Sequence, residues 1–155
     1  MCREHGVDVL LVQETHRGTA SRRPRIRGMK LILERPHDQY GSAVFVRPDI
    51  DVASTSLTDQ NDIEILTVEI NSCTVTSMYK PPNADFAFEE PNNFQSQQIK
   101  FVLGDFNCHS VAWGYNETGS NGEEPEKWAE SMNIKLIQDP KQPLRRSFQE
   151  KVQLY

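Results

Sequence analysis

The chain has 155 residues, a formal net charge of −5 and a sequence pI near 5.4, with 37% hydrophobic and 25% charged residues. This length suits one globular domain with a buried core. The acidic net charge argues against nucleic-acid binding over the whole surface but allows a local basic patch. The cysteines Cys2, Cys73 and Cys108 form no CxxC pair, which excludes a zinc ribbon or a disulfide framework and indicates reduced thiols in an intracellular protein, nuclear or cytoplasmic.

The first half of the chain predicts strands. The N-terminal MCREHGVDVLLV lacks the pattern of a signal peptide, and no apolar run approaches the ~18 residues that cross a bilayer, so we expect no membrane partner. Residues 7–12 form a short apolar run after a glycine, as expected of a buried strand. Further strands are expected at residues 26–34 and 42–46, followed by a hairpin of residues 63–70 and 73–79.

The second half is less regular. Residues 83–98 are polar and broken by Pro91, so we expect mainly loop, and residues 100–103 return to strand. Residues 124–133 predict a helix, because Pro125 suits a first turn and the neighbouring glutamates match the positive end of the helix dipole. Residues 134–137 are a candidate short strand. Strands outnumber helices, which indicates an α/β or α+β fold with a mostly antiparallel sheet.

Polar side chains follow the strand predicted at residues 100–103. In FVLGDFNCHSVAWGY, Asp105, Asn107 and His109 occupy every second position, so they would face one side if the chain stays extended. The alternative is a turn, since Asp and Asn both favour turns by bonding to nearby backbone.

Glu14 has similar surroundings, because LLVQETH is an apolar strand that ends in a carboxylate and reaches His16 two residues later. Two strands that end in acids could converge on one Mg²⁺, which often takes only one or two carboxylates with water and phosphate oxygens. The alternative is a pair of ordinary acids at the rim of a sheet.

Three further features allow two interpretations each. Tyr79 could hydrogen-bond a phosphate oxygen, or it could be an aromatic residue at the edge of the core. The basic run that contains Arg17, Arg22 and Arg23 could bind a nucleic-acid backbone through counterion release, or it could be a solvated loop. His16 and His109 could be surface histidines or catalytic ones.

The segments LLVQETH, GSAVFVRPDI, TVTSMYKPPN and FVLGDFNCHSVAWGY together resemble the endonuclease/exonuclease/phosphatase superfamily in order and spacing. The resemblance is closest to the endonuclease domain of jockey-like non-LTR retrotransposon polyproteins. It implies a four-layer sandwich of two packed β-sheets flanked by helices, incomplete at its N- and C-terminal strands. Residues 1–148 would form this partial domain, and residues 149–155 a divergent tail.

The same resemblance implies phosphodiester hydrolysis with Mg²⁺ or Mn²⁺ by a monomer that nicks DNA and whose relatives are fused to a reverse transcriptase. Glu14 would be the metal carboxylate, with Asp105 as a second candidate ligand that positions or deprotonates the attacking water. Asn107 and Tyr79 would hold the phosphate, and Gln13 would brace the site. Arg17, Arg22 and Arg23 are candidate DNA contacts.

The family pattern also includes a first strand with an asparagine, a late aspartate-bearing strand and a Ser-Asp-His segment, which this sequence does not show. The first alternative is therefore a catalytically impaired or inactive remnant that binds metal or nucleic acid at most. The second alternative is a phosphoesterase that acts on small substrates.

Overall fold

The structure is a computed structural model that describes residues 6–135 and residue 137. It divides into two compact units, Met1–Asn107 and Cys108–Tyr155, which are described separately below. The expected boundary between a domain of residues 1–148 and a tail of residues 149–155 lies outside the described residues.

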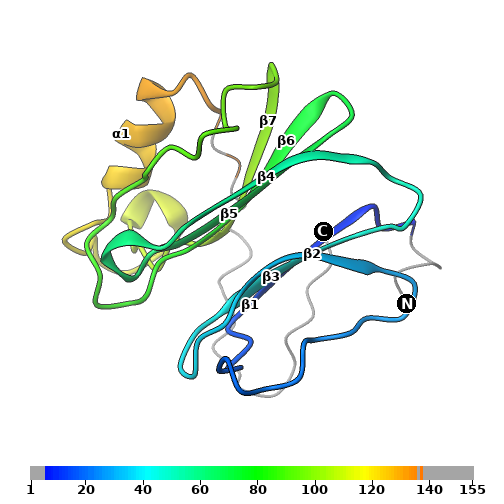
Figure 1. The fold of residues 1–155 in the computed structure, drawn as a ribbon. Helices are drawn as coiled ribbons and strands as arrows, with labels where there is room; N and C mark the ends of the chain where they lie inside the picture. The colour runs from blue at the N-terminus through cyan, green and yellow to red at the C-terminus, as the bar shows by residue number, and fades with distance from the viewer. Residues whose placement is uncertain (1–5, 136, 138–155) are drawn as a thin grey trace. The chain divides into compact units, whose positions relative to one another are not determined.

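The first unit consists of two β-sheets that face each other (Figure 1). The three-stranded sheet has the order β1-β3-β2 and is antiparallel throughout. The four-stranded sheet has the order β4-β5-β6-β7, and its last pair, β6 with β7, is parallel. The strands are β1 (Val9–Gln13), β2 (Lys30–Arg35), β3 (Ser42–Val46), β4 (Val52–Thr58), β5 (Glu64–Ile70), β6 (Cys73–Tyr79) and β7 (Ile99–Asp105).

The core lies between the two sheets. Val44 and Val46 of β3 pack in one buried cluster with Leu66 and Val68 of β5 and with Val75 of β6. β3 is buried at every position because it is the central strand of its sheet and faces β5 across the core. The two packed sheets confirm the predicted sandwich of β-sheets.

Most of the strands predicted for the first unit are present, with two differences. The predicted strand of residues 26–34 begins only at Lys30, because a turn with Gly28 at φ +85° precedes it. Strand β4 was not predicted. Its sequence VASTSLT is rich in Ser and Thr, and it lies at the edge of the sheet with alternate positions exposed. An edge strand needs only one buried face, so the apolar signal along its sequence is weak.

The second unit contains a short 3-10 helix, Val111–Trp113, and the α-helix α1, Glu124–Ser131. The predicted helix of residues 124–133 is therefore two residues too long. Asn133 adopts a left-handed conformation at φ +52°, which the helical backbone does not. The strand expected at residues 134–137 is not present at 134, 135 or 137, and residue 136 is outside the described residues. No described helix is long and apolar enough to cross a membrane.

Strand β7 exposes an apolar stripe. Ile99, Phe101 and Leu103 alternate along the strand and are 52%, 51% and 47% exposed. They occupy the same face because strand residues two apart point the same way. Among the described strands β7 is also the last of the four-stranded sheet, so apolar side chains lie along this edge.

Candidate active site

The ends of three strands of the first unit meet at one place. β6 and β7 run parallel with Tyr79 opposite Asp105, so both strands end at the same level. Glu14 directly follows β1, and the Tyr79 hydroxyl donates a hydrogen bond to Glu14 Oε1 at 3.1 Å. The structure thus brings a carboxylate from one sheet to a phenol and a second carboxylate at the end of the other sheet.

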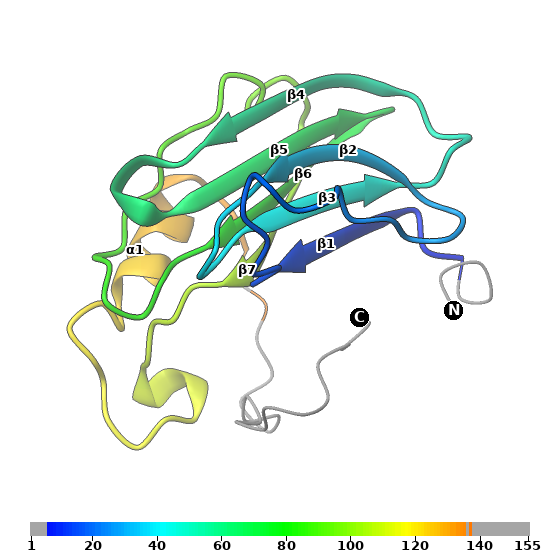
Figure 2. The ribbon, with the colours of Figure 1, turned by 60° about the horizontal axis from the view of Figure 1, so that its bottom comes forward.

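Gln13 joins the two sheets next to these groups. Its Nε2 donates to Ser77 Oγ at 3.0 Å and to the Met78 carbonyl oxygen at 2.9 Å. Its Oε1 accepts a hydrogen bond from Asp105 N at 3.1 Å. Figure 2 shows the ends of β1 and β7 close together, where this side chain connects them. The carboxamide uses both its donor and its acceptor, so it fixes the spacing between Glu14 and Asp105.

Gly104 makes this close approach possible. A Cβ atom at position 104 would lie 1.8 Å from the Met78 carbonyl oxygen and 2.9 Å from Gln13 Nε2. Both neighbours are held by the hydrogen bonds that connect the sheets. The glycine of GDFN therefore leaves the space that the Gln13 side chain occupies.

The chain turns sharply where it leaves β1. Glu14 and His16 have φ angles of +52° and +50°, which non-glycine residues rarely adopt. Two backbone hydrogen bonds hold this turn. Thr15 N donates to the Gly41 carbonyl oxygen at 3.0 Å, and His16 N donates to the Tyr40 carbonyl oxygen at 2.8 Å. The β2–β3 loop (residues 36–41) therefore holds the segment that carries Glu14. The side chain of His16 is exposed.

The chain also turns where it leaves β7, so of the two alternatives for residues 105–109, an extended chain or a turn, the structure has the turn. β7 ends at Asp105, and Asn107 is left-handed at φ +44°. Asn107 N donates to Asp105 Oδ1 at 3.0 Å, which is the turn chemistry that Asp favours. The Asn107 side chain nevertheless stays beside Tyr79, since its Nδ2 donates to the Lys80 carbonyl oxygen at 2.8 Å.

His109 belongs to the second unit, where its ring stacks on Tyr115 with centroids 4.3 Å apart. This contact is the one that the structure gives for the His109 ring, and it lies within the second unit.

The Tyr79 phenol is held in its neutral form. Burial raises the pKa of Tyr79 well above its ordinary value, and the negative charge of Glu14, the hydrogen bond to Glu14 and the charge of Asp105 raise this pKa further. A neutral phenol is a hydrogen-bond donor. Tyr79 can therefore donate to an anionic oxygen throughout the physiological pH range.

Lys80 is a residue of this site that the sequence did not indicate. It is completely buried, and its Nζ donates to the carbonyl oxygens of Pro81 at 3.0 Å and Ala84 at 2.8 Å. Its own N donates to the Asp105 carbonyl oxygen at 2.9 Å. Lysine is almost never fully buried, so a sequence gives no reason to expect this one to hold a loop from inside.

The arginine run follows the Glu14 segment. Arg22 and Arg23 are exposed, and Arg17 is partly buried where its backbone forms an isolated bridge with His37. The structure thus leaves two of the three candidate arginines on the surface and attaches the third to the β2–β3 loop.

The acidic groups at the strand ends suit a hard divalent cation. Within residues 6–135 and 137, no group of three or more His, Cys, Asp or Glu side chains gathers around a common point. Glu14 and Asp105 place carboxylate groups beside Tyr79. One or two carboxylates, completed by water and phosphate oxygens, are the usual ligand set of Mg²⁺, so these residues fit such an ion.

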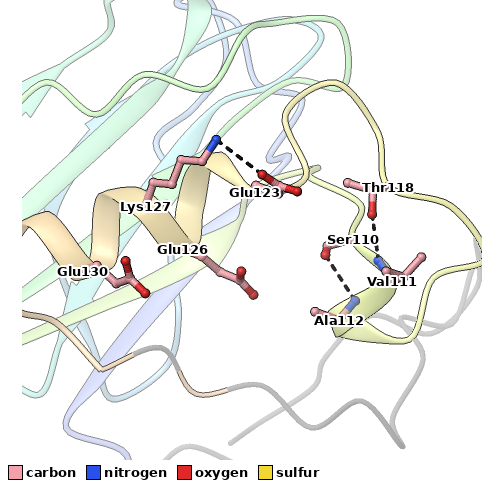
Figure 3. A pocket seen from close by; sticks show the side chains of 8 residues that line it. All are labelled: Ser110, Val111, Ala112, Thr118, Glu123, Glu126, Lys127 and Glu130. Atoms are coloured by element: carbon pink, nitrogen blue, oxygen red, sulfur yellow. Dashed lines mark hydrogen bonds and ion pairs between the residues drawn. The ribbon is translucent and has the colours of Figure 1, made fainter.

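The second unit has a hollow of its own (Figure 3). Its lining includes Glu123, Glu126, Lys127 and Glu130, and Lys127 Nζ lies 3.4 Å from Glu123 Oε2. Ser110 Oγ accepts a hydrogen bond from Ala112 N at 3.2 Å, which caps the short 3-10 helix. These are surface ion pairs and a capping bond, so among the described residues we take the strand ends of the first unit as the candidate site.

A sequence model described as the Endonuclease/Exonuclease/phosphatase family matches residues 1–149. No curated protein matches the chain significantly.

Proposed function

The chain belongs to the endonuclease/exonuclease/phosphatase family, and on this premise we propose that it is a metal-dependent phosphodiesterase that nicks DNA. Members of this family are generally dependent on a divalent metal ion. The observation that carries the proposal is the meeting of Glu14, Tyr79 and Asp105 at three strand ends that Gln13 locks together.

Glu14 would hold the metal ion, with Asp105 as a second candidate ligand and Mg²⁺ or Mn²⁺ as the ion. When bound, such an ion polarises the phosphoryl oxygen and lowers the pKa of coordinated water. The backbone strain at Glu14 supports this role, because strained φ values gather where a side chain must be presented in one direction.

Asp105 would orient the attacking water and accept its proton. One of its oxygens, Oδ1, accepts the Asn107 N–H, and a carboxylate has about four acceptor positions in total. The carboxylate is therefore fixed in direction and keeps capacity for a water molecule. A positioned base of this kind contributes about 10²–10⁴ in rate.

Asn107 and Tyr79 would donate to the phosphate oxygens. One N–H of the Asn107 amide bonds to the Lys80 carbonyl oxygen, and the amide group has a second N–H to offer. The Tyr79 hydroxyl donates to Glu14 in this structure and would transfer its hydrogen bond to a phosphate oxygen as negative charge grows there.

The basic run after Glu14 supports DNA as the substrate. Arg17, Arg22 and Arg23 begin a stretch of residues 17–30 that contains no acid, in a chain whose net charge is −5. Such a local patch binds a phosphate backbone without regard to sequence. The YKPP and GDFNCH segments support descent from a retrotransposon endonuclease of the jockey-like kind, which would act as a monomer inside the cell, in the nucleus or the cytoplasm.

The experiment that tests the proposed substrate compares two phosphoesters. Purified chain in Mg²⁺ is incubated with supercoiled plasmid and, separately, with a small aryl phosphomonoester. We expect relaxed circles and no release of the aryl alcohol. Release of the alcohol without nicking would replace the proposal by a small-substrate phosphoesterase, and inactivity of folded protein on both would leave an inherited site without chemistry.

A further inference from the structure

We propose that Glu64, a carboxylate on β5, is a positioning residue that fixes the metal-binding conformation of Glu14. This inference rests on the proposed function for the metal itself, but the conformational part stands on contacts of the described residues alone. The hydrogen bonds of Glu64 go to Arg35, Gly41 and Ser42, so its effect passes through the β2–β3 loop.

Glu64 clamps the β2–β3 loop at both of its ends. Glu64 is completely buried, and its Oε1 accepts hydrogen bonds from Arg35 Nη1 at 2.8 Å and Gly41 N at 2.9 Å. Its Oε2 accepts a hydrogen bond from the Ser42 hydroxyl. Arg35 ends β2, and Ser42 begins β3. A single carboxylate from the four-stranded sheet therefore ties both ends of the β2–β3 loop in the other sheet.

The β2–β3 loop is joined in turn to the Glu14 segment by backbone hydrogen bonds. The carbonyl oxygens of Gly41 and Tyr40 accept the hydrogen bonds of Thr15 N and His16 N, at 3.0 Å and 2.8 Å. Gly41 itself has φ +94°, and a Cβ there would lie 2.5 Å from Thr15 Oγ1. The loop backbone thus packs directly against the residue after Glu14, and the Gly41 peptide connects Glu64 on one side to Thr15 on the other.

These hydrogen bonds maintain a strained backbone at residues 14–16. Glu14 and His16 are both left-handed, and Thr15 lies between them. A strained backbone persists only where its surroundings over-determine it. The two hydrogen bonds to the loop supply that constraint, and the loop is held in turn by Glu64. Releasing the clamp would let residues 14–16 relax and let the Glu14 carboxylate turn from the site.

Glu64 also lies next to Tyr79, the residue that donates a hydrogen bond to Glu14. Its Cα pairs with that of Tyr79 across β5 and β6, and the Tyr40 ring of the loop lies 5.6 Å from the Tyr79 ring. The clamp therefore holds the loop against the same residue that donates to Glu14. The loop therefore contacts both partners of the Glu14–Tyr79 hydrogen bond, through Thr15 beside Glu14 and through the Tyr40 ring beside Tyr79.

The charge of Glu64 matters as well as its shape. All three partners are donors, and an ionised carboxylate offers only acceptors. Glutamine has nearly the same size but turns one acceptor into an NH₂ group, which would face a donor. Glu64→Gln should therefore loosen the loop while leaving the core volume unchanged.

The experiment compares three variants of the full chain. Glu64→Gln removes the charge, and Ser42→Ala removes one donor and leaves the other two. The matched control is Glu69→Gln on the same strand, whose carboxylate bonds to Ser54 and Gln97, both at 2.7 Å, and not to the loop. The readouts are amide hydrogen exchange at Thr15 and His16 by nuclear magnetic resonance, and Mn²⁺ binding by titration calorimetry.

We expect Glu64→Gln to lose about tenfold or more of the exchange protection at both amides and to bind Mn²⁺ about 10–100-fold more weakly, the usual effect of losing an outer partner of a metal ligand. Ser42→Ala should show a smaller loss of the same kind, and Glu69→Gln none. Unchanged protection in folded Glu64→Gln would overturn the inference. If Glu64→Gln does not fold, unchanged protection in Ser42→Ala overturns it instead.

Failure of the proposed function gives a different pattern. If the wild-type chain binds no Mn²⁺ while Glu64→Gln still loses protection at Thr15 and His16, the positioning role stands and the metal site is wrong. If Mn²⁺ binds equally to the wild type and to Glu64→Gln, the positioning role is wrong and the metal site stands.

Discussion

At the scale of single residues, the site depends on donors and acceptors whose directions are fixed by neighbours. Tyr79 shows this best, because its ring is buried, its hydroxyl reaches Glu14, and its raised pKa keeps the proton on the oxygen. Replacing the hydroxyl removes the donor without opening a large cavity.

We expect Tyr79→Phe to lower single-turnover nicking about 10²-fold, since losing one donor to a developing anion has an effect of about that size. The Michaelis constant should change little, because the donor matters most in the transition state. The control is Tyr115→Phe in the second unit, which should nick like the wild type. Full activity of Tyr79→Phe would remove Tyr79 from the chemistry.

Gly104 makes a prediction about stability. An alanine Cβ would lie 1.8 Å from the Met78 carbonyl oxygen, a backbone atom that Gln13 also binds. We expect Gly104→Ala to lower the free energy of unfolding by about 3 kcal/mol, the upper range for overpacking, as measured by urea denaturation. Gly119→Ala is the control, because its Cβ would have no neighbour closer than 3.8 Å. Equal stability of the two variants would contradict the close packing of Gly104 against Met78 of β6 and the Gln13 side chain.

At the scale of elements, the sequence predicts strands where burial is strong on both faces or alternates cleanly. Residues 42–46 and 73–79 are strands in the structure as predicted, because both are buried along nearly their whole length. β4 lacks that signal, since its half-buried residues Val52, Ser54, Ser56 and Thr58 are mostly polar. Composition cannot distinguish such a strand from a loop before its sheet neighbour β5 is known.

The site shows the same limit. The sequence shows that acids follow two strands, and the pairing of β6 with β7 places Tyr79 beside Asp105. The turn at Asn107 could not be predicted with certainty, because extended and turned chains are both compatible with Asp and Asn. Lys80 and Glu64 could not be predicted for another reason. Both are completely buried, and nothing in the sequence predicts the burial of a charged residue.

The apolar stripe on β7 predicts that this strand promotes association between chains. Phe101 is the middle of three half-exposed apolar residues on an edge strand, a combination that favours association with other chains. We expect Phe101→Thr to bind less of a hydrophobic dye and to aggregate at a higher temperature on heating. Val75→Thr, on the adjacent strand but buried, should instead lose stability. Unchanged dye binding by Phe101→Thr would show that the stripe is covered in solution.

At the scale of the whole molecule, an acidic chain binds DNA only if its few basic groups are concentrated. The exposed Arg22 and Arg23 lie in such a concentration after the Glu14 segment. Replacing both by alanine should reduce the slope of log binding constant against log salt by about 2, or roughly 0.9 for each phosphate contact. Fluorescence anisotropy with a short duplex measures the slope.

The control for this measurement is Arg47→Ala. Arg47 is also on the surface but is paired with Asp8 at 2.7 Å and Asp49 at 2.6 Å, so we expect it to leave the slope unchanged. Equal slopes for the wild type and the double arginine variant would mean that DNA meets the protein elsewhere.

The central claim is that the residues at the strand ends form a metal-dependent nuclease site. The most direct test is nicking of supercoiled plasmid in Mg²⁺ by the wild type, by Asp105→Asn and by Asp49→Asn, an exposed aspartate that serves as the matched control. All three proteins are first shown to be folded. We expect relaxed circles from the wild type and Asp49→Asn that disappear with chelator, and a loss of about 10²–10⁴ in rate for Asp105→Asn. Nicking by Asp105→Asn at the wild-type rate would contradict it.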